Sequence, residues 1–62
     1  PKTDAATEWL RQTLADGPLS SDMIFRAGEL AGFKERTIWR AKGKLGIKAR
    51  KRGIDGGWEW VL

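Results

Sequence analysis

The absence of both cysteine and histidine most constrains what this chain can fold into, because a domain of 62 residues is close to the size at which one hydrophobic core is only marginally stable. Without cysteine there is no disulfide, and without cysteine or histidine there is no ordinary zinc site. The fold must therefore be held by packed apolar side chains. Four tryptophans in so short a chain are able to supply much of that core.

The same inventory argues against catalysis and against a membrane span. The chain has no histidine or cysteine for acid–base or nucleophilic chemistry, no phosphate-binding loop and no suggestively spaced pair of carboxylates. No stretch approaches the roughly 18 apolar residues of a membrane span, and no secretory signal is visible. We therefore expect a non-enzymatic, cytoplasmic domain with no cofactor, metal, membrane partner or small-molecule substrate. Because the chain opens at Pro1, we expect residues 1–62 to be one domain of a larger protein.

Two segments in the first half have the three-and-four apolar spacing of a helix with one buried face. The first, residues 3–18, is expected to start at a cap on Thr3 or Asp4 and to stop at Asp16-Gly17-Pro18. Its buried positions are Ala6, Trp9, Leu10, Thr13 and Leu14. The second, residues 19–33, has a cap on Ser20 or Ser21 and a left-handed end at Gly32. Its expected buried stripe is Ile24, Ala27, Leu30 and Ala31, with Met23 beside it.

A third helix is predicted to begin near Lys34 or Glu35 and to end at Gly46. Its buried face is Ile38, Ala41 and Leu45, and its opposite face is Arg36, Arg40 and Gly43, with Trp39 and Lys44 on the shoulders. After Gly46 the apolar spacing changes to two, in residues 47–50 and again in residues 58–62. Two such runs around the glycine-containing loop 52–57 predict a β-hairpin.

The order of these elements predicts the fold class. The second and third helices are joined by a short turn that contains Gly32, which is the helix-turn-helix pattern, and the hairpin follows directly. We therefore expect an α+β, mainly α fold, namely a three-helix winged helix-turn-helix with a C-terminal two-stranded β-hairpin wing.

The charges are segregated along the chain. Residues 34–52 hold nine Lys or Arg and one acidic residue, Glu35, whereas residues 1–33 and 53–62 each carry a net charge of −2. A block with a net charge of +8 inside a chain of net charge +4 indicates a polyanionic partner, most often nucleic acid.

The basic block supplies the candidate contacts with DNA. Arg36 and Arg40 lie one turn apart on the third helix, where a guanidinium can bind a guanine edge or a phosphate. Thr37 and the first backbone N–H groups of that helix are able to hold a phosphate as well. In the wing, basic residues suit contacts with the phosphate backbone or the minor groove. The predicted DNA-binding residues are Arg36, Thr37, Trp39, Arg40, Lys44, Lys48, Arg50, Lys51 and Arg52.

The tryptophans divide into core positions and one exception. Three tryptophans have the same spacing as the neighbouring buried residues and are expected in the core, namely Trp9, Trp58 and Trp60. The alternative for Trp58 and Trp60 is stacking on unpaired bases. Trp39 lies on the shoulder of the third helix, where solvent is expected. Three roles remain open for Trp39: packing against the wing, stacking on a base or sugar, and contact with another protein. Packing against the wing is favoured.

At "ERTIWRAKGKLGIKARKRGIDGGWEWVL" the chain resembles the small C-terminal winged-helix segment of phage and prophage replication ATPases, the primase–helicase and related AAA-type class. The upstream residues 9–33 also fit, so the resemblance covers most of the chain. The matching residues are Arg36, Thr37, Ile38, Arg40, Ala41, Lys42, Lys44, Leu45, Gly46, Gly56, Gly57, Trp58 and Trp60. The resemblance implies DNA recognition for DNA replication, with the catalytic motor elsewhere in the parent protein. Two positions depart from the pattern, since Trp39 stands where a basic or polar residue is usual and Lys34 where a Ser or Thr cap is usual.

Two functions therefore remain in view. The first is a non-catalytic DNA-binding domain, with duplex DNA favoured and single-stranded DNA as the other option. The second is a protein-interaction module, for docking or oligomerisation within a replication or transcription complex, because Trp39 flanked by Arg36 and Arg40 has the composition of an interface hot spot.

Overall fold

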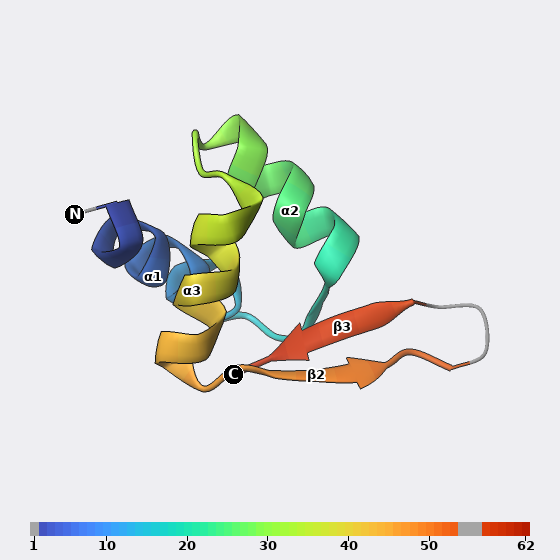
Figure 1. The fold of residues 1–62 in the computed structure, drawn as a ribbon. Helices are drawn as coiled ribbons and strands as arrows, with labels where there is room; N and C mark the ends of the chain where they lie inside the picture. The colour runs from blue at the N-terminus through green and yellow to red at the C-terminus, as the bar shows by residue number, and fades with distance from the viewer. Residues whose placement is uncertain (1, 54–56) are drawn as a thin grey trace.

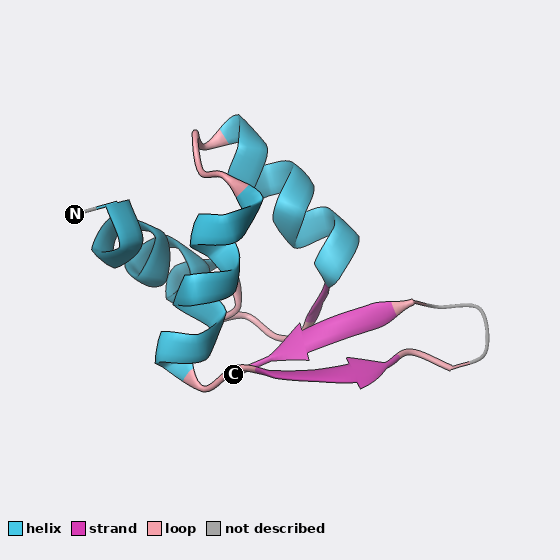
Figure 2. Ribbon diagram, viewed as in Figure 1, coloured by secondary structure: helices cyan, strands magenta, loops and turns pink. Residues whose placement is uncertain are grey.

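Three helices pack beside a three-stranded antiparallel sheet in the computed structural model, which describes residues 2–53 and 57–62 (Figures 1 and 2). The helices are α1 (Lys2–Thr13), α2 (Ser21–Leu30) and α3 (Glu35–Leu45), and the strands are β1 (Leu19–Ser20), β2 (Lys48–Lys51) and β3 (Trp58–Val61). The prediction of a mainly helical α+β fold is confirmed. No helix in the described part of the chain has both the length and the apolar character to cross a membrane.

The sheet has one strand more than the predicted two-stranded hairpin. The strand order is β1-β3-β2, and β1 pairs with β3 through Leu19 opposite Trp60 and Ser20 opposite Glu59. A strand of two residues cannot show an alternating apolar pattern, so the sequence carried no signal for it. The pairing joins the segment between α1 and α2 to the middle of the sheet.

The core lies where the inner faces of the three helices meet the start of the hairpin. Its buried residues are Ala6, Leu10, Leu14, Ile24, Ile38, Ala41, Ile47 and Trp60. The predicted buried faces of α1 and α3 are confirmed for most of their residues. Trp9 and Leu45, which were also predicted on these faces, are only partly buried against the core. Trp60 is the largest fully buried side chain, so one tryptophan of the C-terminal pair anchors the hairpin.

The buried face of α2 differs from the predicted stripe. Ile24 is buried as expected, but Ala27 and Ala31 are exposed and Leu30 is 87% exposed. Gly28 is buried instead, and Phe25 packs partly against the core. The buried face is rotated because α2 contacts its neighbours through Gly28. Glycine has no side chain, so a search for spaced apolar residues does not find it.

The helix ends are set by local signals, with one difference at α1. Ser20 caps α2, since its hydroxyl accepts a hydrogen bond from the Met23 backbone N–H at 3.2 Å. Gly32 and Gly46 have φ of 91° and 67°, the left-handed conformation that ends a helix and favours glycine. At the N-terminus α1 already includes Lys2, so neither Thr3 nor Asp4 is its cap, and it ends at Thr13, before the predicted stop.

The hairpin of β2 and β3 projects past the helices (Figure 1). This projection explains why the predicted core position of Trp58 is wrong. Trp58 and Trp60 lie on one face of β3, as their spacing predicts, but Trp60 is 1% exposed and Trp58 is 52% exposed. Trp58 therefore stands beyond the reach of the core. The Arg52 N–H donates to the Gly57 carbonyl at 2.9 Å across the loop. The predicted turn residue Gly56 lies outside the described residues.

Candidate functional site

The outer side of α3 presents the two arginines that the sequence singled out. Arg36 and Arg40 are both exposed, and neither makes an ion pair within the described part of the chain. Thr37 is partly buried, and its backbone N–H donates to the Lys34 carbonyl at 3.0 Å. That N–H is therefore already used within the chain.

Lys44 is occupied by a neighbouring helix. Its ammonium lies 3.2 Å from the Asp4 carboxylate of α1, and both side chains are more than half exposed. The pair links the last turn of α3 to the first turn of α1. An exposed pair of this kind stabilises the fold by at most about 1 kcal/mol, but it reduces the positive charge that Lys44 offers to a ligand.

The register of the hairpin places the basic residues of β2 on both faces of the sheet. Lys48 pairs with Val61 and Arg50 with Glu59 on one face, whereas Lys51 pairs with Trp58 on the other. Every residue of β2 is exposed. Since β2 is an outer strand of the sheet, side chains from either face can reach a ligand along this edge.

Glu59 is a residue of the site that sequence reasoning missed. Its carboxylate accepts a hydrogen bond from the Arg50 guanidinium at 2.7 Å and lies 3.7 Å from the Arg52 guanidinium. Such an ion pair can be predicted when a carboxylate lies opposite a basic residue in a hairpin. That prediction requires the strand register, which the sequence did not provide. Glu59 therefore neutralises part of the wing charge.

Four of the predicted DNA-binding residues remain as exposed cations without an ion pair in the described part of the chain. Two lie on α3 and two on β2, and they are Arg36, Arg40, Lys48 and Lys51. This set is smaller than the basic block suggests, because Lys44, Arg50 and Arg52 face carboxylates.

Trp39 packs against the sheet, as the favoured interpretation predicted. Its ring centroid lies 5.2 Å from that of Trp60 and 5.6 Å from that of Phe25 of α2. The Lys42 ammonium lies 5.7 Å from the Trp39 ring and 5.5 Å from the Trp60 ring, within reach of cation–π attraction. Even so, Trp39 remains 50% exposed, so part of its ring faces solvent.

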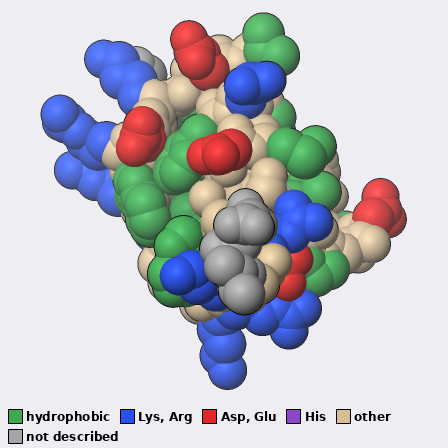
Figure 3. Space-filling view, turned by 90° about the vertical axis from the view of Figure 1, so that its right-hand side faces the viewer, with side chains coloured by type: hydrophobic (Ala, Val, Ile, Leu, Met, Phe, Trp, Pro, Cys, Tyr) green, Lys and Arg blue, Asp and Glu red, His purple; other side chains and the backbone are tan. Residues whose placement is uncertain are grey.

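An apolar groove, here called the aromatic groove, opens beside this cluster. It has a volume of about 330 Å³ and is lined by Ser21, Phe25, Trp39, Ala49, Trp58 and Trp60. Figure 3 shows this side of the molecule, where apolar side chains lie among both acidic and basic ones. The sequence predicted none of this groove, because its walls come from α2, α3 and both strands of the hairpin.

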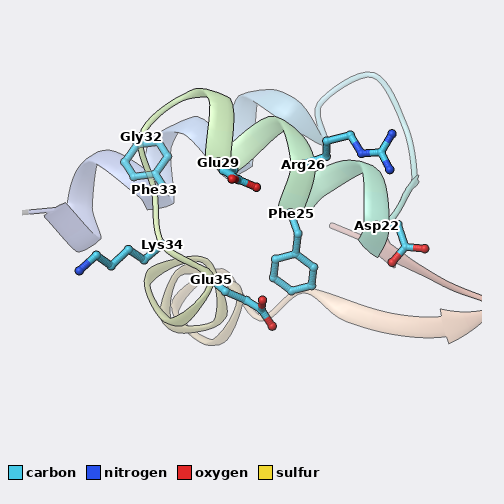
Figure 4. Close-up of a pocket in the computed structure, with 8 residues that line it drawn as sticks. All are labelled: Asp22, Phe25, Arg26, Glu29, Gly32, Phe33, Lys34 and Glu35. Atoms are coloured by element: carbon cyan, nitrogen blue, oxygen red, sulfur yellow. The ribbon is translucent and has the colours of Figure 1, made fainter.

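A second, wider groove separates α2 from the start of α3 (Figure 4). Its volume is about 880 Å³, and its charged lining consists of Asp22, Arg26, Glu29, Lys34 and Glu35. Three carboxylates against two cations make this groove a poor site for a polyanion. Phe25 lines both grooves, so this second groove adjoins the aromatic groove.

Comparisons with protein-family models, with curated proteins and with solved structures found no match for this chain. The resemblance to phage replication ATPases therefore stays a prediction.

Proposed function

We propose that this chain is a non-catalytic, DNA-binding winged-helix domain that contacts duplex DNA through α3 and the β2–β3 hairpin. The observation that carries the proposal is a set of four exposed cations, two on α3 and two on β2, that make no ion pair with the residues at 2–53 and 57–62. The two elements are consecutive and are joined through Gly46 and Ile47. Binding of a polyanion by such a set is driven by the release of counterions.

Each element suits a different part of the duplex. Arg36 and Arg40 lie one turn apart on α3, and a helix of this size fits the major groove, where a guanidinium forks onto guanine or phosphate oxygens. The hairpin carries Lys48 on one face and Lys51 on the other. Cations on both faces suit a hairpin that lies between two phosphate chains, as a wing does in a minor groove.

The resemblance in sequence supports a place in a replication protein of a phage or prophage, where the domain would serve a motor located elsewhere in the parent chain. A small domain that offers four such cations on α3 and β2 is expected to bind weakly by itself. When several copies are tethered in one assembly, the effective concentration makes such weak contacts sufficient.

The test is fluorescence anisotropy of a labelled random-sequence duplex titrated with the domain over a range of salt concentrations. If the four cations each neutralise one phosphate, the logarithm of the association constant falls against the logarithm of the salt concentration with a slope of about −3.6. The double variant Arg36→Ala/Arg40→Ala should lower the affinity and reduce the slope by about 1.8.

A matched control separates local contacts from net charge. Arg11 of α1 and Arg26 of α2 are also exposed, and although Arg11 pairs with Glu8, Arg11→Ala/Arg26→Ala removes the same net charge from other helices. The proposal predicts that this variant keeps the salt slope of the unmodified domain. Equal losses in the two double variants would show that only net charge matters, and an affinity that does not change with salt would refute the proposal.

The alternative function is a protein-docking module, and the aromatic groove favours it. Trp39 and Trp58 are half exposed beside an arginine-rich helix, and tryptophan and arginine are enriched in interface hot spots. Trp58 is the better residue for a test, because Trp39 also packs against Trp60 and Phe25 and its removal would disturb the fold. A domain that binds no duplex even at low salt would favour this alternative.

A further inference from the structure

We infer that the aromatic groove binds an unpaired base of single-stranded DNA, which stacks on Trp58 while its phosphate lies near Lys51. The inference rests on the proposed DNA binding and deepens it, since it assigns a second class of DNA ligand to a groove that shares Lys51 with the four cations proposed to bind the duplex.

The first observation is the state of Trp58. Its indole is 52% exposed, and it takes no part in the aromatic pairs found among the described residues, which connect Trp39, Trp60 and Phe25 on one side and Trp9 and Phe33 on the other. A large ring left half in water contributes little to the core. It is, however, a platform of the kind on which proteins stack bases of single strands.

The second observation is the chemistry of the groove around that ring. Apart from the Ser21 hydroxyl, the side chains that line it are apolar, and four of them are aromatic rings. Its volume of about 330 Å³ is enough for a planar ring system but small for a folded partner. A ligand that fits has a flat, apolar part that can be inserted edge-on or face-on among rings.

The third observation is the charge at the edge of the groove. Lys51 pairs with Trp58 across the hairpin, so both side chains lie on the same face of the sheet as neighbours. The Lys42 ammonium lies over the rings of Trp39 and Trp60, two of the residues that line the groove. A ligand with planar apolar groups and a negative charge at every repeat matches this arrangement, and single-stranded nucleic acid has that chemistry.

Acidic side chains beside the aromatic groove determine on which side the phosphate chain runs. Asp22 and Glu35 line the adjoining groove that shares Phe25, and their charge repels phosphates from that side. The phosphate chain is therefore expected to cross the hairpin side, over Lys51, while the base points inward.

A second copy of this chain is a weaker occupant for the groove. Stable interfaces take about 800 Å² from each partner, whereas two half-exposed indoles offer roughly 250 Å² at most.

The experiment compares two labelled probes, a single-stranded oligothymidylate and a random-sequence duplex, by anisotropy and by tryptophan fluorescence. Trp58→Ala should weaken binding of the oligothymidylate by roughly 5- to 150-fold, the range expected for one stacked base. Trp58→Phe should restore most of the affinity, because a smaller ring still stacks. Leu30→Ala is the matched control, since Leu30 is an exposed apolar residue outside the groove. Duplex affinity should stay within about twofold in all three variants.

The outcomes separate this inference from the proposed function. Duplex binding without oligothymidylate binding, or an oligothymidylate affinity that Trp58→Ala leaves unchanged, overturns the inference alone. Sedimentation that shows a dimer dissociated by Trp58→Ala also overturns it, because the groove would then be the dimer interface. Failure to bind either probe at low salt overturns both proposals. Thermal denaturation of each variant verifies that it is folded at the assay temperature.

Discussion

Gly28 is predicted to be a position where even one methyl group disturbs the fold. A Cβ atom built on Gly28 would lie 2.3 Å from Ile38 Cδ1, 3.2 Å from Trp9 Cη2 and 3.4 Å from Ile38 Cγ1. Favourable contacts between carbon atoms need about 3.5–4.0 Å, so the methyl group of Ile38 must move by more than about 1 Å. Ile38 is 1% exposed, so its side chain would have to move within the core rather than into solvent.

The magnitude follows from two opposing effects in Gly28→Ala. Alanine in a helix is more favourable than glycine by about 1 kcal/mol, whereas overpacking a core costs about 1–3 kcal/mol. Gly43→Ala is a matched control, because Gly43 also lies within a helix and a Cβ there meets nothing within 4 Å. The control should gain stability. The difference between the two variants then isolates the overpacking, and in a domain of this size about 1 kcal/mol corresponds to roughly 4–8 °C in Tm.

Thermal and urea denaturation followed by circular dichroism measure both variants, and a double-mutant cycle identifies the contact. Ile38→Val removes the Cδ1 atom and by itself should cost about 0.5–1.5 kcal/mol. In the Gly28→Ala background the same change should cost little or increase stability, because it removes the clash. The reasoning is refuted if Gly28→Ala is as stable as Gly43→Ala, or if the effects of Gly28→Ala and Ile38→Val are additive.

Three further changes test other contacts. Ser20→Ala removes the cap of α2 and should destabilise the domain by about 1 kcal/mol, whereas Ser21→Ala should have little effect in the same thermal denaturation. Glu59→Gln releases the two arginines that its carboxylate holds, so duplex affinity should rise and the salt slope should steepen by up to about 1.8 in the anisotropy assay; an unchanged slope would contradict this. The hydrogen bond from Arg11 holds the pKa of Glu8 below its ordinary value, so the pair stabilises the fold at neutral pH and loses this contribution as the pH falls through that lowered pKa. Arg11→Gln should raise the pKa of Glu8 in an NMR titration, and a pKa that does not move would contradict the assignment.

Features that depend on a few neighbouring residues were predictable from the sequence. Glycine at positions 32 and 46 ended α2 and α3, since only a few residues around the end decide whether the chain turns left-handed. The faces of α1 and α3 followed from apolar residues spaced by three and four. The hairpin followed from the change of period after Gly46.

Features that depend on which elements meet were not predictable in this way. The face of α2 was rotated because Gly28, rather than an apolar side chain, faces Ile38 and Trp9. Trp58 has the same phase as Trp60, but it is exposed because the hairpin extends beyond the helices.

The composition and order of residues by themselves determined a small, mainly helical α+β domain with a block of positive charge, because helix ends, periodicity and net charge are local or additive properties. Only the tertiary structure decided which of the described cations pair with a carboxylate and that Phe25, Trp39 and Trp58 line one groove. Those outcomes depend on distances between residues far apart in the chain. Such distances are set by the packing of helices on the sheet and by strand register, and the pattern within any single segment does not contain them.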